Sequence, residues 1–196
     1  MYSPKKMQEN LNDENFKFKK KFGQNFIIDE NIIDSIIKKS DLKDNSLVIE
    51  IGPGAGSLTK KLSKTVKNVL CYEIDKDLKP FLDKMDDNVE VIYDDFLKRD
   101  IISDLKKYNN EFIYVVANLP YYITTPIIMK IIKNIINVNK IVVMVQKEVG
   151  NRFKANVNSK DYGSLTVYLN YYFNIKKIMD ISPNVFIPKP RVDSIV

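Results

Sequence analysis

From residue 29 onward the chain alternates short apolar runs with amphipathic stretches. Apolar runs of strand length occupy residues 46–52, 68–75, 88–96, 111–118 and 140–146. Stretches with the spacing of an amphipathic helix lie at residues 29–41, 57–66, 76–85, 100–108, 125–136 and 147–155. Strands that alternate with helices predict a largely parallel sheet with helices on both of its faces.

The remaining segments complete one predicted domain over residues 16–196. Residues 1–15 are polar, and we expect a flexible tail there. The helix at 125–136 is predicted to begin at a threonine cap followed by a proline. Residues 165–173 fit a helix or a strand, whereas 174–182 and 191–196 indicate late strands.

The composition excludes several kinds of chemistry. Histidine is absent and Cys71 is the single cysteine, so His-based triads, His-containing zinc sites and an intrachain disulfide are excluded. We expect no bound metal. The most apolar helical stretch is interrupted by Lys130 and Lys133 and is too short to cross a bilayer. Because the N-terminus also lacks the apolar core of a signal peptide, we expect a cytoplasmic protein. We also expect a monomer.

Basic and aromatic residues alternate near the start of the chain. The net charge is +6, and "FKFKKKFG" at residues 16–23 interleaves four lysines with three phenylalanines. Such a segment suits a nucleic-acid strand, but a solvated stretch beside a few core anchors explains it equally well.

The first strand runs into a glycine-rich turn, "VIEIGPGAGSLT". Gly52, Gly54 and Gly56 allow a tight turn and a close approach of the backbone to a ligand. Ser57 stands where the dinucleotide fingerprint has its third glycine, so the turn fits phosphates less well. A strand-to-helix turn without any ligand is the alternative interpretation.

Acidic residues end the next two predicted strands. Glu73 stands 21 residues after Gly52, the spacing at which an acid accepts hydrogen bonds from ribose hydroxyls. Asp94 and Asp95 end the third strand, and Asp95 is suited to accept from an adenine amino group. Because ligands gather at the carboxyl ends of strands, these residues together predict a pocket for a nucleoside-bearing cofactor.

The fourth strand ends in "NLPYY", which places an amide and aromatic rings at the same sheet edge. The Asn118 side-chain oxygen and the backbone carbonyl of Leu119 or Pro120 could accept hydrogen bonds from an adenine N6 amine. Tyr121 offers a face on which a base stacks. A plain strand-end turn with two core tyrosines is the alternative.

These motifs resemble the class I S-adenosylmethionine-dependent RNA adenine N6-methyltransferases. They are most similar to the KsgA-type small-subunit (16S) rRNA adenine N6,N6-dimethyltransferases. The matching segments follow in order across nearly the whole chain past the tail: "KKKFGQNFIID", "EIGPGAGSLT", "EID", "DDF", "NLPYYITTPII", "VQKEVGNRF", "DYGSL" and "FIPKPRVDS". The resemblance implies a Rossmann-like three-layer sandwich whose mostly parallel seven-stranded sheet has an antiparallel late strand.

The resemblance also implies S-adenosylmethionine as cofactor, the small ribosomal subunit as partner, and a role for each site residue. Asn118, Leu119, Pro120, Tyr121 and Phe186 would surround the target adenine, with Phe186 stacked on its second face. The cofactor would lie against Asn25, Ile27, Gly52, Gly54, Glu73, Ile74, Asp95, Phe96 and Asn118. Residues 17–23 would lie near the RNA.

The chain departs from the family's pattern at two points, and other functions compete with the one that the resemblance implies. Tyr122 stands where the family often has an asparagine. The family continues into a C-terminal helical RNA-binding domain after the "VDS" motif, and we expect that domain to be absent here. We therefore expect cofactor binding but poor binding or modification of the ribosomal substrate. A resistance-type methyltransferase of large-subunit rRNA shares the cofactor motifs, and an RNA-binding assembly factor is the rival from another class. An NAD-dependent oxidoreductase is disfavoured by Ser57 and by the Asn-Leu-Pro-Tyr turn.

Overall fold

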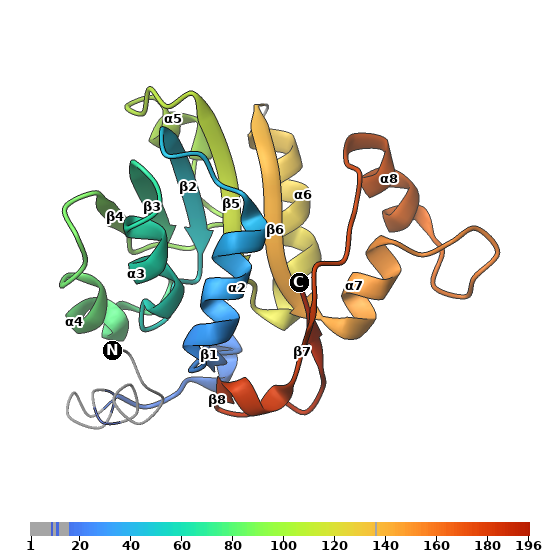
Figure 1. Ribbon diagram of the computed structural model, residues 1–196, viewed down its shortest axis with the longest axis horizontal. Coiled ribbons are helices and arrows are strands. Elements are labelled where there is room, and N and C mark those ends of the chain that lie inside the picture. Colours follow the sequence, from blue (N-terminus) through green and yellow to red (C-terminus); the bar gives the residue numbers. More distant parts are fainter. Residues whose placement is uncertain (1–8, 10, 12–15, 136) are drawn as a thin grey trace.

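A seven-stranded sheet forms the centre of the computed structural model, which describes residues 9, 11, 16–135 and 137–196 (Figure 1). Its strands, in spatial order, are β4 (Val89–Ile92), β3 (Asn68–Tyr72), β2 (Ser46–Ile51), β5 (Phe112–Asn118), β6 (Val138–Gln146), β9 (Ser194–Ile195) and β7 (Asp180–Ile181). The first five are parallel, and β9 runs antiparallel to both of its neighbours. The predicted sheet is therefore confirmed.

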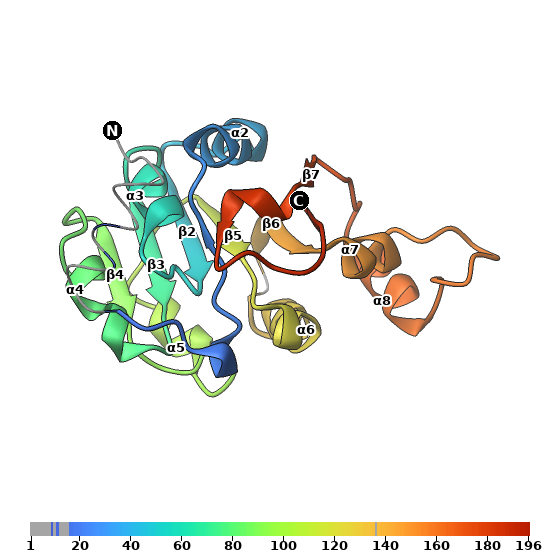
Figure 2. The ribbon, with the colours of Figure 1, turned by 90° about the horizontal axis from the view of Figure 1, so that it is seen from below.

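Helices cover both faces of this sheet, as Figures 1 and 2 show. On one face lie α2 (Glu30–Ser40) and α3 (Ser57–Ser63), and on the other lie α5 (Ile101–Leu105) and α6 (Thr124–Asn134). The remaining helical elements are η1 (Lys20–Phe22), η2 (Lys76–Leu78), α4 (Lys79–Leu82), η3 (Tyr121–Ile123), α7 (Lys147–Phe153), α8 (Ser164–Tyr172) and η4 (Pro183–Val185). No helix within the described residues is long and apolar enough to cross a membrane.

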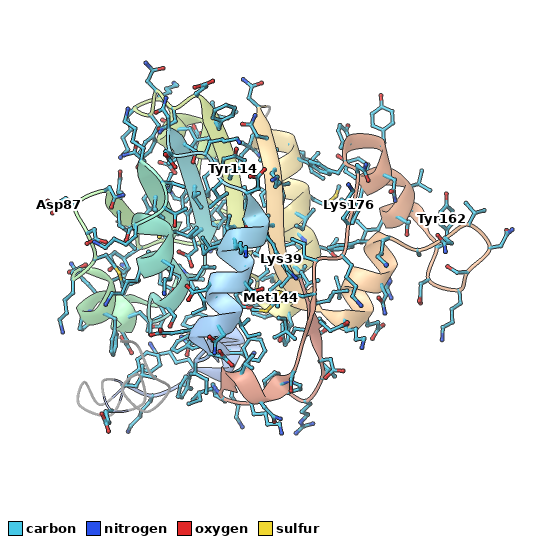
Figure 3. All side chains as sticks on the ribbon, viewed as in Figure 1. Lys39, Asp87, Tyr114, Met144, Tyr162 and Lys176 are labelled. Atoms are coloured by element: carbon cyan, nitrogen blue, oxygen red, sulfur yellow. The ribbon has the colours of Figure 1, made fainter. Side chains whose placement is uncertain are left out.

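Alternating residues of the central strands fill two hydrophobic cores, because successive side chains of a strand point to opposite faces. Leu47 and Ile49 of β2 pack with Ile131 of α6, on one face. On the other face, Tyr114 and Met144 pack in the cluster that contains the isoleucines of α2 (Figure 3). The strands are thus buried on both sides, which explains their nearly continuous apolar sequence.

Several local predictions need correction. Residues 165–173, which fitted either element, form most of α8, and only Asp180–Ile181 of the late strand predicted at 174–182 pair in the sheet. Helix α6 begins at Thr124, one residue before Thr125, and its start has no side-chain cap, because the N-cap residue is Ile123, whose side chain has no polar atom.

Two further segments were missed or lie mostly outside the described residues. β1 (Phe26–Ile27) and β8 (Phe186–Ile187) pair antiparallel in a separate small sheet that the apolar pattern does not predict. Of the tail expected at residues 1–15, only Glu9 and Leu11 are described, and Leu11 is buried in the cluster that contains Phe26.

We expect Leu70→Ala, in the middle of β3, to lower the free energy of unfolding by about 2–5 kcal/mol, because Leu70 is fully buried and truncation leaves a cavity. Urea denaturation followed by circular dichroism measures the change. Ile102→Ala is the matched control, since that side chain is half exposed. Equal losses in both variants would contradict the assignment of Leu70 to the core.

Candidate functional site

A cleft opens at the carboxyl ends of β2, β3, β4 and β5 and holds about 960 Å³ of open space, counted with the solvent at its mouth. All but one of the predicted site residues line it: Asn25, Ile27, Gly52, Gly54, Glu73, Ile74, Asp95, Phe96, Asn118, Leu119, Pro120 and Tyr121. The topology thus gathers residues from four strand ends and from the segment before β1.

The glycine turn after β2 depends on backbone conformations that other residues rarely adopt. Gly52 and Gly54 have φ of 70° and 59°, in the left-handed region. A Cβ atom at Gly54 would stand 2.7 Å from the ring of Phe26. The turn therefore presents bare backbone to the cleft, because a side chain has no room at Gly54 and the backbone conformation of Gly52 disfavours one.

Glu73 directly follows β3, and its carboxylate points toward the glycine turn. It is 4% exposed and accepts hydrogen bonds from the backbone N–H groups of Gly54, at 3.1 Å, and Asp75, at 2.8 Å. Burial raises the pKa of Glu73 to about 7, although these two donors favour the ionised form. A buried carboxylate with spare lone pairs is suited to accept hydrogen bonds from hydroxyl groups.

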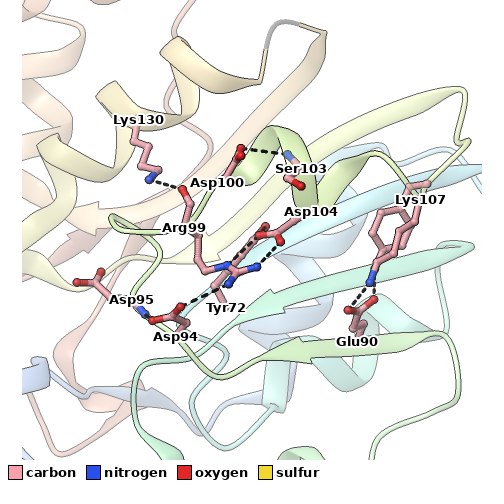
Figure 4. Close-up of polar contacts among 11 residues, drawn as sticks. Tyr72, Glu90, Asp94, Asp95, Arg99, Asp100, Ser103, Asp104, Lys107 and Lys130 are labelled. Carbon is pink, nitrogen blue, oxygen red and sulfur yellow. Dashed lines mark hydrogen bonds and ion pairs between the residues drawn. The ribbon is translucent and has the colours of Figure 1, made fainter.

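A polar network fixes the loop after β4 that carries Asp95 (Figure 4). The Asp95 carboxylate accepts from the backbone N–H of Leu97 at 2.9 Å. Lys130 of α6 donates to the carbonyls of Leu97 and Arg99, both at 2.7 Å, and the Arg99 guanidinium pairs with Asp104. Lys130, which interrupts an apolar helix in the sequence, therefore anchors one wall of the cleft.

The side chain of Asn118 is oriented by a hydrogen bond to the backbone of the segment before β1. Its Nδ2 donates to the backbone carbonyl of Asn25 at 2.8 Å. Asn25 is itself held by a bond from its own Nδ2 to the carbonyl of Gly23, at 3.1 Å. Since the amide nitrogen is engaged, the Oδ1 atom of Asn118 is left to accept a hydrogen bond from a ligand.

The turn after Asn118 carries Tyr121 in a fixed position. The Tyr121 hydroxyl and the Ser194 Oγ of β9 are 2.6 Å apart, and burial raises the pKa of the tyrosine. The carbonyl of Pro120 already accepts from the backbone N–H of Ile123 and from the hydroxyl of Thr124. The turn is therefore rigid and leaves the ring of Tyr121 on the cleft wall.

The structure does not bring Phe186 to the cleft. This residue is 2% exposed, pairs with Ile27 through the β1–β8 ladder and packs into the core beside α2. Its ring has no open face for a base, so the predicted second stacking surface is not formed by Phe186 in this arrangement.

Sequence reasoning also missed residues that take part in the site. Gln24 and Tyr122 line the cleft, and Asp75 contacts the segment before β1. Lys19, expected near RNA, instead turns inward to Asp75 and Asp77, whereas Lys17, Lys20 and Lys21 are exposed. The "EID" motif contains a second carboxylate, Asp75, two residues after Glu73. A buried carboxylate needs a hydrogen-bond partner, so the motif could have indicated that Asp75 binds another segment.

A second carboxyl group, that of Glu50, is buried below the glycine turn. It is 2% exposed and accepts a hydrogen bond from the Cys71 thiol at 3.7 Å. Burial raises the pKa of Glu50 to about 8, so the group is largely neutral at pH 7.

Comparison with known proteins places these features in context. The model of the family "Ribosomal RNA adenine dimethylase" matches residues 15–196. Ribosomal RNA small subunit methyltransferase A of Macrococcus caseolyticus is 48% identical to this chain. The match covers 99% of this chain and 67% of that protein. The chain thus spans about two thirds of the length of this curated relative.

Two solved structures resemble the fold closely. A dimethyladenosine transferase from Plasmodium falciparum is 31% identical with a TM-score of 0.75, over 87% of this chain and 61% of that one. The 23S rRNA methyltransferase ErmE is 27% identical with a TM-score of 0.73, over 87% of this chain and 67% of that one.

The raised pKa of Glu50 predicts how stability depends on pH. The folded state holds its proton up to about pH 8, whereas an unfolded glutamate releases it near pH 4.5. The free energy of unfolding should therefore fall as the pH rises through this window, by an amount on the order of a few kcal/mol. Glu50→Gln should reduce this slope in urea denaturation between pH 5 and pH 8, with Glu73 supplying part of the remainder.

Glu111→Gln is the control, because Glu111 is exposed. An unchanged slope in the Glu50 variant would show that this carboxyl is ionised in the folded protein throughout the range.

Proposed function

This chain belongs to the ribosomal RNA adenine dimethylase family, and we propose that it transfers methyl groups to two adjacent adenines of small-subunit (16S) rRNA. The acceptor is N6 of each base, near the 3′ end of the RNA, and the product is dimethyladenosine. The observation that carries the proposal is the meeting of Asn118 with Gly52, Glu73 and Asp95 in one cleft. Identity of 48% to a small-subunit methyltransferase, against 27% to a 23S rRNA methyltransferase, favours the small subunit.

The donor set of the cleft fits S-adenosylmethionine. When bound, this cofactor supplies a methyl group activated by the adjacent sulfonium. Glu73 would accept hydrogen bonds from the ribose hydroxyls and Asp95 from the adenine amino group. The bare backbone of Gly52 and Gly54 lies against the methionine end, and apolar contacts come from Ile27, Ile74 and Phe96, with Asn25 beside them.

The target base lies on the other side of the cleft, against the turn after β5. The Oδ1 atom of Asn118 accepts one of the two hydrogens on N6. We assign the second acceptor to the carbonyl of Leu119, because that of Pro120 already accepts two hydrogen bonds. With both hydrogens held, the nitrogen lone pair is directed out of the ring system and toward the methyl group.

Stacking on Tyr121 offsets much of the cost of extruding the base. A base stacked on an aromatic ring gains about 1–3 kcal/mol, and extrusion costs a comparable few kcal/mol. Proximity and orientation then supply most of the rate enhancement. No strong base is needed, because the amine becomes far more acidic once it is alkylated, and this suits a chain without histidine.

We further propose that the chain acts on immature small subunits in the cytoplasm, as a monomer, and that methylation accompanies assembly of the subunit. Exposed Lys17, Lys20 and Lys21 lie on the segment next to the cleft and would face the phosphates of the RNA.

Cofactor binding is the simplest test. S-adenosylhomocysteine at about 100 times its dissociation constant should raise the free energy of unfolding by about 2.7 kcal/mol, and the melting temperature with it. NAD at the same concentration is the control and should leave the melting temperature unchanged. Stabilisation by NAD and not by S-adenosylhomocysteine would contradict the proposed methyltransferase and indicate an NAD-dependent oxidoreductase.

Asn118→Ala should lower methyl transfer at least about 100-fold, because the amine loses its orienting acceptor. The measurement is incorporation of labelled methyl into dimethyladenosine of immature small subunits. Affinity for S-adenosylhomocysteine should change less than tenfold in the variant. Asn151→Ala, on an exposed position of α7, is the matched control.

Two outcomes would contradict the proposal. Label that appears in large-subunit rRNA would favour the resistance-type enzyme. A variant that keeps full transfer would remove Asn118 from the reaction.

A further inference from the structure

A buried carboxylate outside the cleft, that of Asp75, holds the segment that precedes β1. Asp75 is 1% exposed, which is rare for an aspartate unless it is paired. Its Oδ1 accepts from Lys19 Nζ at 2.6 Å and from the backbone N–H of Asp77 at 3.2 Å, and its Oδ2 accepts from Gln24 Nε2 at 2.7 Å. Both oxygens are therefore engaged, two of their three bonds reaching back about 50 residues in the sequence.

Residues 19–25, which we name the N-terminal strap, are closed into a ring by these contacts. The Gln24 side-chain oxygen accepts from the backbone N–H of Lys19 at 2.7 Å. Lys19 and Gln24, which flank η1, are thus bonded to each other and to the carboxylate of Asp75. Removing the charge of Asp75 would release both ends together.

The strap leads directly to the residue that orients Asn118. Gln24, held by Asp75, is followed by Asn25, whose carbonyl accepts from Asn118 Nδ2. The backbone N–H of Asp75 also donates to Glu73, the predicted ribose acceptor. One residue, Asp75, therefore supports both halves of the cleft.

We propose that Asp75 is a positioning residue: it clamps the N-terminal strap onto the cleft through Lys19 and Gln24, so that the Asn25 carbonyl fixes the Asn118 amide. The inference rests on the proposed function for its consequence in catalysis. The clamp itself is a property of the protein without ligand.

A neighbouring pair provides an internal comparison. Lys19 Nζ is also 2.5 Å from Asp77 Oδ2, but the Asp77 side chain is 64% exposed. Exposed ion pairs are screened by water and contribute little, whereas a buried charge with several donors is hard to replace. Removing the charge of Asp77 should therefore leave the strap in place.

The test compares Asp75→Asn with Asp77→Asn, and Lys19→Met with Lys17→Met, in the whole chain. Asp75→Asn should weaken binding of S-adenosylhomocysteine by up to about tenfold, and Lys19→Met by a smaller factor, in isothermal titration calorimetry, because the released strap carries Asn25, which the proposed function places beside the cofactor. The two controls should stay within about twofold, since Asp77 and Lys17 are exposed. The double variant Lys19→Met/Asp75→Asn should bind no more weakly than Asp75→Asn alone, because both changes open the same clamp.

Two readouts without ligand separate a clamp from general stabilisation. Amide hydrogen exchange of residues 20–25 should accelerate in Asp75→Asn while that of β2 and β5 stays unchanged. The side-chain amide signal of Asn118 in NMR spectra, assigned through Asn118→Ala, should shift toward that of exposed Asn151.

Exchange that accelerates equally throughout the sheet, or an Asn118 signal that does not move, would overturn the inference. Should Asp75→Asn fail to fold, Lys19→Met decides on the same readouts, since Lys19 is partly exposed. If the unaltered chain does not bind S-adenosylhomocysteine, the proposed function fails while exchange and NMR still test the clamp. If the unaltered chain binds S-adenosylhomocysteine but Asp75→Asn behaves as Asp77→Asn does, the positioning role of Asp75 is wrong and the proposed function still stands.

Discussion

The arrangement of the cleft depends on one hydrogen bond, from Asn118 Nδ2 to the carbonyl of Asn25, between residues 93 positions apart. An amide has one donor group and one acceptor atom, so committing the nitrogen to the protein decides what the oxygen can do. Without that bond the side chain could rotate and offer its NH₂ group to an amine, which is repulsive. The bond requires that β5 end at the cleft and that the residues before β1 be held beside it.

The sheet explains why so much of the site was predictable from the sequence. Parallel strands place all their carboxyl ends along one edge, so residues that follow successive strands meet in space. Gly52, Glu73 and Asn118 each come directly after an apolar run, and Asp95 is the second of two acidic residues that follow another. Counting runs was enough to bring them together, because a long strand buried on both faces has an unambiguous sequence signature.

The parts that were not predicted have no such signature. β1 and β8 are two residues long, and no periodicity can be detected over two positions. Their pairing nevertheless buries Phe186, which its motif alone would place beside the target base. Charge patterns also do not reveal which of several consecutive lysines turns inward, so Lys19 could not be told from its exposed neighbours. Residues 165–173 are apolar and aromatic on most sides, which leaves the period of the element undefined.

The contact between the Tyr121 hydroxyl and Ser194 links the cleft to the antiparallel part of the sheet. Ser194 is fully buried and belongs to the antiparallel strand β9, which is only two residues long. With its hydroxyl anchored there, the long axis of the ring cannot swing away from the cleft wall independently of β9. The direction of that axis follows the position of β9, and so does the place at which a purine could lie against the ring.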